Sequence, residues 1–186
     1  VISTLPVVVR AVPVPAVAQA VIAAIGLVFA LIDQIFRWMK TERKIGIAID
    51  NQSGHDLHKP KYHTSSGKIT AIGLNIRHKN AALISAEKSQ ATPYGTYGVV
   101  SYVIGNTARR LVVMWSIPGT YAGWKNWFKA TVVDENVPMD EKLFDDMYND
   151  KVAAHGKTAP ADGGTATWQS GGYILQGIMT NGGAAS

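Results

Sequence analysis

The sequence predicts a mainly β protein, a sandwich or a barrel, with one long helix near its N-terminus and one short helix late in the chain. Two observations support this. An apolar, uncharged run extends from Ala11 to Ile32. After Lys40, short segments with strand-like alternation are separated by Gly, Pro and Asn, which is typical of antiparallel β folds.

The composition places limits on the class of protein. A chain of 186 residues with 47% hydrophobic and 17% charged residues is long enough to bury one core, and it excludes a disordered composition. The net charge of +5 favours anionic surfaces, either acidic lipid or nucleic acid. The sequence contains no cysteine, so disulfides and thiolate-held metal are excluded.

The first fourteen residues predict an extended arm. Pro6, Pro13 and Pro15 oppose a helix, and the triplet from Val7 to Val9 favours an extended backbone. Pro15 suits the first position of a helix, so we expect the arm to end at Val14.

A helix is predicted from Pro15 to Lys40, with apolar residues recurring at helical spacing. It would be roughly 39 Å long at 1.5 Å per residue, enough to cross a hydrocarbon core of about 30 Å. Two alternatives are a helix packed on the sheet of a soluble domain and a permanent membrane anchor. The opposite face carries a narrow, weakly polar stripe: Gln19, Gly26, Ala30, Asp33 and Arg37.

Five strands and a short helix are predicted after Lys44. The strands are expected at 44–51, 69–76, 98–104, 111–117 and 127–133, with a further strand at Tyr173–Met179. Pro138 precedes a segment with acids in its first turn, in which Phe144 and Tyr148 are spaced at i, i+4, so a short surface helix should present both rings.

A second concentration of unusual residues follows Pro118 and Gly119. Aromatic side chains crowd into eight positions of this predicted loop: Tyr121, Trp124, Trp127 and Phe128. Tyr and Trp combine an apolar body with a polar tip, and they form cages for quaternary ammonium groups and collect at membrane interfaces. Lipids with choline headgroups offer both targets.

Enzymatic and metal chemistry find little support. His55, Asp56, His58 and His63 lie close in sequence, but without a metal-binding spacing, so we predict solvated histidines and no metal or cofactor. The sequence has no Gly-rich phosphate loop, G-x-S-x-G or H-E-x-x-H motif. We therefore expect a protein that is not an enzyme.

Four blocks in succession resemble the actinoporins and actinoporin-like cytolysins. They are KIGIAIDNQSG, YGVVSYVIGN, the loop from Ser116 to Pro118 with NWF, and LFDDMYND. The resemblance covers Lys44 to Asp150, and extends to the apolar helix in character. It implies a compact β-sandwich flanked by two helices, secreted as a monomer, that recognises phosphocholine headgroups, notably of sphingomyelin. It also implies oligomerisation in the target cell membrane, where the N-terminal helices form a pore. The weakly polar stripe of the helix at 15–40 would then line this pore.

The resemblance also implies site residues. A headgroup pocket is expected near Tyr148, with Arg43 facing lipid phosphate and Trp127 at the interface. The full set implied for lipid binding, with the loop tyrosine added, is Arg43, Ser66, Tyr97, Ser116, Pro118, Tyr121, Trp124, Trp127, Phe144 and Tyr148. This chain departs from the family at Gly123, where an additional tryptophan is usual, and at Phe144 and Asn149, where tyrosines are typical.

The sequence thus predicts three functional parts: an arm at 1–14, a membrane-inserting helix at 15–40 and a lipid-binding sandwich at 41–186. The function expected is that of a pore-forming cytolysin, with membrane lipids and further copies of itself as partners. A lectin-like module of the same fold, without pore formation, is the alternative. Nucleic-acid binding ranks third, because the basic residues are scattered and the cluster Lys40–Lys44 includes Glu42.

Overall fold

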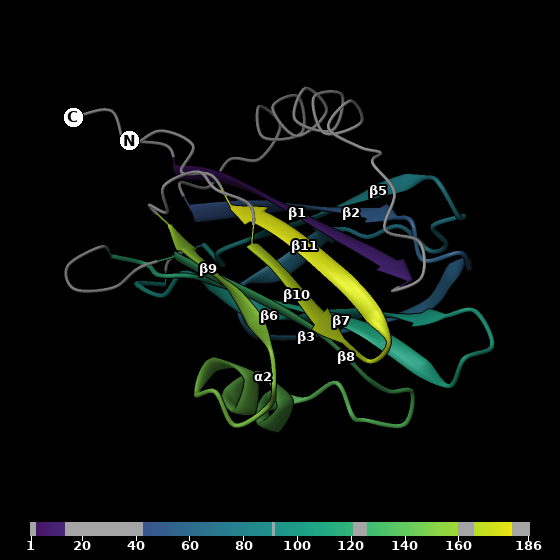
Figure 1. The fold of residues 1–186 in the computed structure, drawn as a ribbon. Helices are drawn as coiled ribbons and strands as arrows, with labels where there is room; N and C mark the ends of the chain where they lie inside the picture. Colours follow the sequence, from purple (N-terminus) through teal and green to yellow (C-terminus); the bar gives the residue numbers. More distant parts are fainter. Residues whose placement is uncertain (1–2, 14–42, 91, 121–125, 160–165, 180–186) are drawn as a thin grey trace.

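Two β-sheets face each other in the computed structural model, and one helix covers the outer face of the second sheet (Figure 1). The structure describes residues 3–13, 43–90, 92–120, 126–159 and 166–179. The predicted β-sandwich is confirmed over these residues. The N-terminal helix predicted at 15–40, with all its pore-lining residues, lies outside the described residues.

The first sheet has six strands in the order β10-β11-β1-β2-β5-β4. The bounds of these strands are β1 Ser3–Pro13, β2 Arg43–Asn51, β4 Lys68–Ala71, β5 Ala81–Glu87, β10 Ala166–Ser170 and β11 Tyr173–Met179. The predicted strand at 69–76 is shorter in the structure, since β4 ends at Ala71. β5 and β10 were not predicted. In β5 the apolar Ile84 and Ala86 are buried together with the polar Ser85 and Glu87.

The second sheet has five strands in the order β3-β6-β7-β8-β9. Their bounds are β3 Leu57–Ser66, β6 Thr96–Ile104, β7 Arg109–Ile117, β8 Asn126–Asp134 and β9 His155–Ala159. The central strands β6 and β7 are nearly continuous in buried residues, because one face packs on the first sheet and the other lies under the helix.

The segment expected as a separate arm is instead a strand inside the first sheet. β1 is extended, as its prolines and valines predict, but it pairs in parallel with β2 and antiparallel with β11. Val9 is fully buried in the core between the sheets. The physical reason is that a run of valines in an extended chain suits a strand buried within a sheet.

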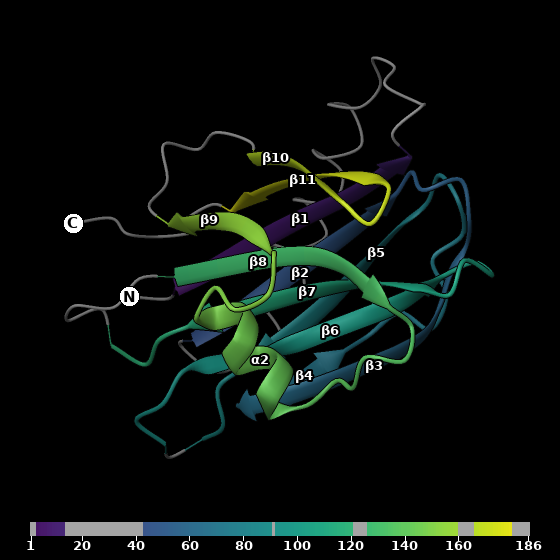
Figure 2. The ribbon, with the colours of Figure 1, turned by 60° about the horizontal axis from the view of Figure 1, so that its bottom comes forward.

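Helix α2, Glu141–Tyr148, lies across the outer face of the second sheet (Figure 2). Its N-cap is Asp140, whose Oδ1 accepts a 2.9 Å hydrogen bond from the amide of Leu143. Leu143 and Met147 pack on Val112 and Met114 of β7. The short helix is confirmed, but Phe144 is only 6% exposed and is not presented to solvent.

Candidate functional site: an aromatic pocket beside helix α2

Four predicted site residues form one row across the second sheet. Ser66 of β3 is paired with Tyr97 of β6, Tyr97 with Ser116 of β7, and Ser116 with Trp127 of β8. Neighbouring strands lie about 4.8 Å apart, and residues directly opposite each other present their side chains on the same face. The row therefore forms a continuous polar and aromatic strip on the sheet face that α2 covers.

A pocket of about 520 Å³ opens beside the two middle residues of this row, Tyr97 and Ser116. The aromatic pocket is lined by two turns, strand residues from the row and the last turns of α2. Its lining residues are Pro93, Tyr94, Gly95, Tyr97, Ser116, Pro118, Gly119, Thr120, Phe144 and Tyr148. None of these described residues carries a charge, so the walls are mainly aromatic and apolar, with hydroxyl groups among them.

Four aromatic rings follow one another from the sheet to the helix and back to the sheet. The ring centroids of Tyr97 and Phe144 are 5.7 Å apart, those of Phe144 and Tyr148 are 5.8 Å apart, and both pairs are stacked. The rings of Tyr148 and Trp127 are tilted, with centroids 6.3 Å apart. Each such pair contributes about 0.5–1.5 kcal/mol beyond its buried area, so the rings fix one another in place.

Two glycines bring the turns at the pocket into backbone contact. A Cβ atom at Gly95 would lie 1.7 Å from the carbonyl oxygen of Ile117, and one at Gly119 would lie 1.9 Å from that of Pro93. No side chain fits at either position, so the turns can meet only because both residues are glycine.

Side chains outside the pocket fix these turns. The Ser66 hydroxyl donates a 3.0 Å hydrogen bond to the carbonyl of Gly95. The Nε of Arg43, the first residue of β2, donates a 3.2 Å hydrogen bond to the carbonyl of Gly119. Both predicted residues thus contact backbone that lines the pocket, although neither lines the pocket itself.

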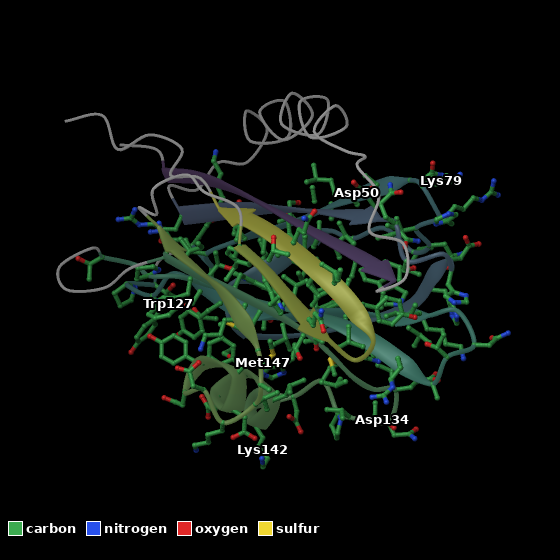
Figure 3. All side chains as sticks on the ribbon, in the orientation of Figure 1. Asp50, Lys79, Trp127, Asp134, Lys142 and Met147 are labelled. Carbon is green, nitrogen blue, oxygen red and sulfur yellow. The ribbon has the colours of Figure 1, made fainter. Side chains whose placement is uncertain are left out.

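The helix is attached to the sheet at its first turn. Nε2 of His63 on β3 lies 2.7 Å from the Glu141 carboxylate. This hydrogen bond lowers the pKa of Glu141. Figure 3 shows the two sides of α2, with Met147 between helix and sheet and Lys142 directed away from the sheet.

Five predicted residues line the pocket together: Tyr97, Ser116, Pro118, Phe144 and Tyr148. Trp127 contacts Tyr148 but does not line the pocket. Tyr121 and Trp124 lie outside the described residues. Sequence reasoning missed Tyr94, which is 62% exposed on the turn before β6. The Pro-Tyr-Gly triplet at 93–95 was a usable signal, because it predicts a turn that carries an aromatic ring.

The histidines near residue 58 are used in structural contacts. His58 bonds the carbonyl of Gly105, and Asp56 accepts a hydrogen bond from the amide of His78. In the described part of the chain, no three His, Asp or Glu side chains come together in a way that could hold a metal ion. Among the same residues, no helix has the length and apolar character needed to cross a bilayer.

The fold and pocket define a β-sandwich protein with an aromatic pocket at one end and a helix forming part of its wall. The sequence model of the sea anemone cytotoxic protein family matches residues 16–186. The chain therefore belongs to this family, that of the actinoporins, and the resemblance found in the sequence is confirmed.

Individual relatives support the same assignment. The chain is 32% identical to bryoporin of Physcomitrium patens over 171 residues, which cover 91% of this chain and 95% of bryoporin. It is 31% identical to DELTA-alicitoxin-Pse1b of Phyllodiscus semoni, covering 91% and 74% of the two chains. It is 29% identical to DELTA-stichotoxin-Hcr4a of Radianthus crispa, covering 91% and 95%.

A solved structure is similar in fold alone. The crystal structure of the lipid binding protein Nakanori superposes with a TM-score of 0.55 at 12% identity. The match spans 60% of this chain and 55% of Nakanori. It supports the sandwich architecture, independently of any shared site.

Proposed function

We propose that this protein is a secreted pore-forming cytolysin that binds lipids with choline headgroups, sphingomyelin among them, in the aromatic pocket. The observation that carries the proposal is the pocket itself. Tyr94, Tyr97, Phe144 and Tyr148 provide its aromatic walls. A quaternary ammonium within about 6 Å of such rings gains about 2 kcal/mol or more per contact once it is desolvated.

The polar groups near the pocket suit the phosphate of a phosphocholine headgroup. Ser116 is a lining residue, and a serine hydroxyl can donate to phosphate oxygens. Arg43 brings a guanidinium to the turn at Gly119. A guanidinium supplies charge-assisted hydrogen bonds to phosphate, which are about twice as strong as neutral ones.

The pore itself is assigned to residues 15–40. Their apolar length suits a bilayer, and lipid would replace the sandwich as the partner of the same apolar face. Several copies would assemble on the target membrane, with Gln19, Gly26, Ala30, Asp33 and Arg37 facing the lumen. Because Asp33 and Arg37 carry opposite charges, we expect the pore to discriminate only weakly between cations and anions.

The second candidate function is a lectin-like or lipid-binding module that forms no pore. An aromatic pocket with hydroxyl groups also suits the face of a sugar ring, which gives this candidate a specific basis. The two functions differ in membrane permeabilisation, and the apolar segment at 15–40 favours the first.

The test is dye release from vesicles of phosphatidylcholine, with and without sphingomyelin. Wild-type protein should release the dye, and Tyr148→Ala should need at least tenfold more protein for the same release. Tyr62→Ala is the matched control, because this tyrosine is 52% exposed on β3 and does not line the pocket. It should behave like wild type.

Three results would contradict the proposal in different ways. Binding without release would favour the lectin-like module. Equal release by wild type and a folded Tyr148→Ala variant would remove the pocket from the mechanism. If the protein neither binds the vesicles nor releases the dye, the choline-lipid function is refuted.

A further inference from the structure

A buried lysine lies under the end of the helix that forms the pocket wall. Lys129 is on β8, and only 5% of its surface is exposed. Its cross-strand partner Met114 belongs to the apolar layer beneath α2. Lys129 is not a lining residue of the pocket. An ammonium in such a place is costly unless its donors are all satisfied.

All three donors of the Lys129 ammonium have partners. Nζ is 2.8 Å from the carbonyl oxygen of Met147, 3.3 Å from that of Tyr148 and 2.5 Å from Oδ1 of Asp150. The first two are carbonyls of the last turn of α2, which lack partners within a helix. A cation at this end also interacts favourably with the helix dipole.

The same ammonium lies over an aromatic ring. Nζ is 5.5 Å from the centroid of Trp127, whose ring contacts Tyr148. One face of Trp127 therefore already has a cation from the protein itself.

We propose that Lys129 is the positioning residue of the aromatic pocket. By capping the last turn of α2 from below, it fixes the backbone of Tyr148, and the ring stack then fixes Phe144. The lipid-binding consequence depends on the proposed function, whereas the structural consequence does not. Lys129 acts through Tyr148 and touches no ligand.

The experiment compares Lys129→Met, which keeps the aliphatic stem and removes the ammonium, with Lys142→Met. Lys142 is an exposed lysine on the same helix that pairs with Asp146. Hydrogen exchange of the amides at 145–150 and near-ultraviolet circular dichroism report the helix end and the rings without any lipid. Vesicle binding is measured on phosphatidylcholine with sphingomyelin.

We expect Lys129→Met to raise the exchange rates at 145–150 at least tenfold and to weaken vesicle binding at least tenfold, with strands β6 and β7 still protected. Lys142→Met should change neither. In the Tyr148→Ala background, Lys129→Met should weaken binding no further, because both changes remove the same wall. If Lys129 served only overall stability, Lys129→Met would lower the melting temperature. Its effect on vesicle binding would then add to that of Tyr148→Ala.

Unchanged exchange at 145–150 in folded Lys129→Met would overturn the proposal, and so would additive losses in the double variant. If wild type binds no vesicles, the proposed function fails, and the exchange rates alone decide the role of Lys129. If Lys129→Met does not fold, Lys129→Gln is used, since its amide still donates one hydrogen bond. It should show a smaller increase in exchange at the same amides, and no increase would again overturn the proposal.

Discussion

Tyr97 and Ser116 face each other across β6 and β7, and both line the aromatic pocket. The pairing places a hydroxyl and an aromatic ring side by side on a rigid part of the sheet. The Tyr97 ring then stacks on Phe144 of α2. The pocket is therefore anchored where β6 begins and β7 ends, and the two turns and α2 supply the rest of its lining.

Tyr94 is expected to contribute to ligand binding and hardly to stability. Its ring is 62% exposed on the pocket rim, so Tyr94→Ala removes a wall without opening the core. We expect several-fold weaker binding to phosphatidylcholine vesicles and a change in unfolding free energy of less than about 0.5 kcal/mol. Tyr94→Phe should bind like wild type if the ring face, rather than the hydroxyl, is used; equal losses in both variants would contradict this.

Gly95→Ala and Gly119→Ala are expected to disrupt the rim. Each added Cβ would meet backbone at less than 2 Å, so the two turns must separate. Overpacking of this kind costs about 1–3 kcal/mol, and we expect that loss in urea denaturation together with lost vesicle binding. Gly172→Ala is the control, since a Cβ there meets nothing within 4 Å and only its positive φ is strained. Normal binding by Gly95→Ala would contradict the role of this contact.

The contact between His63 and Glu141 predicts sensitivity to acid. The hydrogen bond from His63 lowers the pKa of Glu141, so the folded state favours the carboxylate. The resulting stabilisation is present above the ordinary Glu pKa of about 4.3 and is lost as the pH falls through the lowered value. Because Glu141 is more than half exposed, we expect the pair to contribute less than about 1 kcal/mol to the free energy of unfolding.

The measurement is urea denaturation of wild type and Glu141→Gln between pH 6 and pH 3. The difference in unfolding free energy should be largest near pH 6 and should shrink towards pH 3. In a His63→Gln background, the effect of Glu141→Gln on the unfolding free energy should be mostly absent. A gap that stays constant with pH would mean that the ionised carboxylate is not what stabilises the helix start.

Removal of the first strand is expected to destabilise the sandwich. β1 separates β2 from β11, so deleting residues 1–13 leaves two strand edges without their partner. A milder variant, Val9→Ala, should cost about 2 kcal/mol by loss of buried methyl groups. Urea denaturation measures both. A truncated chain with wild-type stability would restore the interpretation of this segment as a separate arm.

The sequence was most informative where local chemistry decides structure. Strands β6, β7 and β8 could be predicted because each is an apolar run bounded by Gly, Pro, Asn or charged residues. Helix α2 and the exact bounds of β11 could also be predicted from the local sequence. β1 and β5 could not be placed, because pairing partners distant in sequence decide whether an apolar segment joins a sheet.

In the site too, some residues could be identified from the sequence, whereas others depend on contacts between distant segments. Tyr148 and Ser116 could be identified by resemblance, and the packing of α2 on the second sheet brings them to one pocket. The roles of Lys129 and Gly119 could not be predicted, since a buried ammonium and a backbone contact depend on three-dimensional approach. For the same reason Phe144 was expected at the surface, whereas its ring is buried between Tyr97 and Tyr148.

The position of β1 has a consequence for synthesis of the chain. β1 is made first, yet one of its two partners, β11, begins only at Tyr173. On the ribosome β1 must therefore remain without this partner until β11 has emerged, because β11 is made after all the other described strands. Completion of the first sheet is coupled to synthesis of β11, so a product truncated before Tyr173 would lack the partner of β1 on that side.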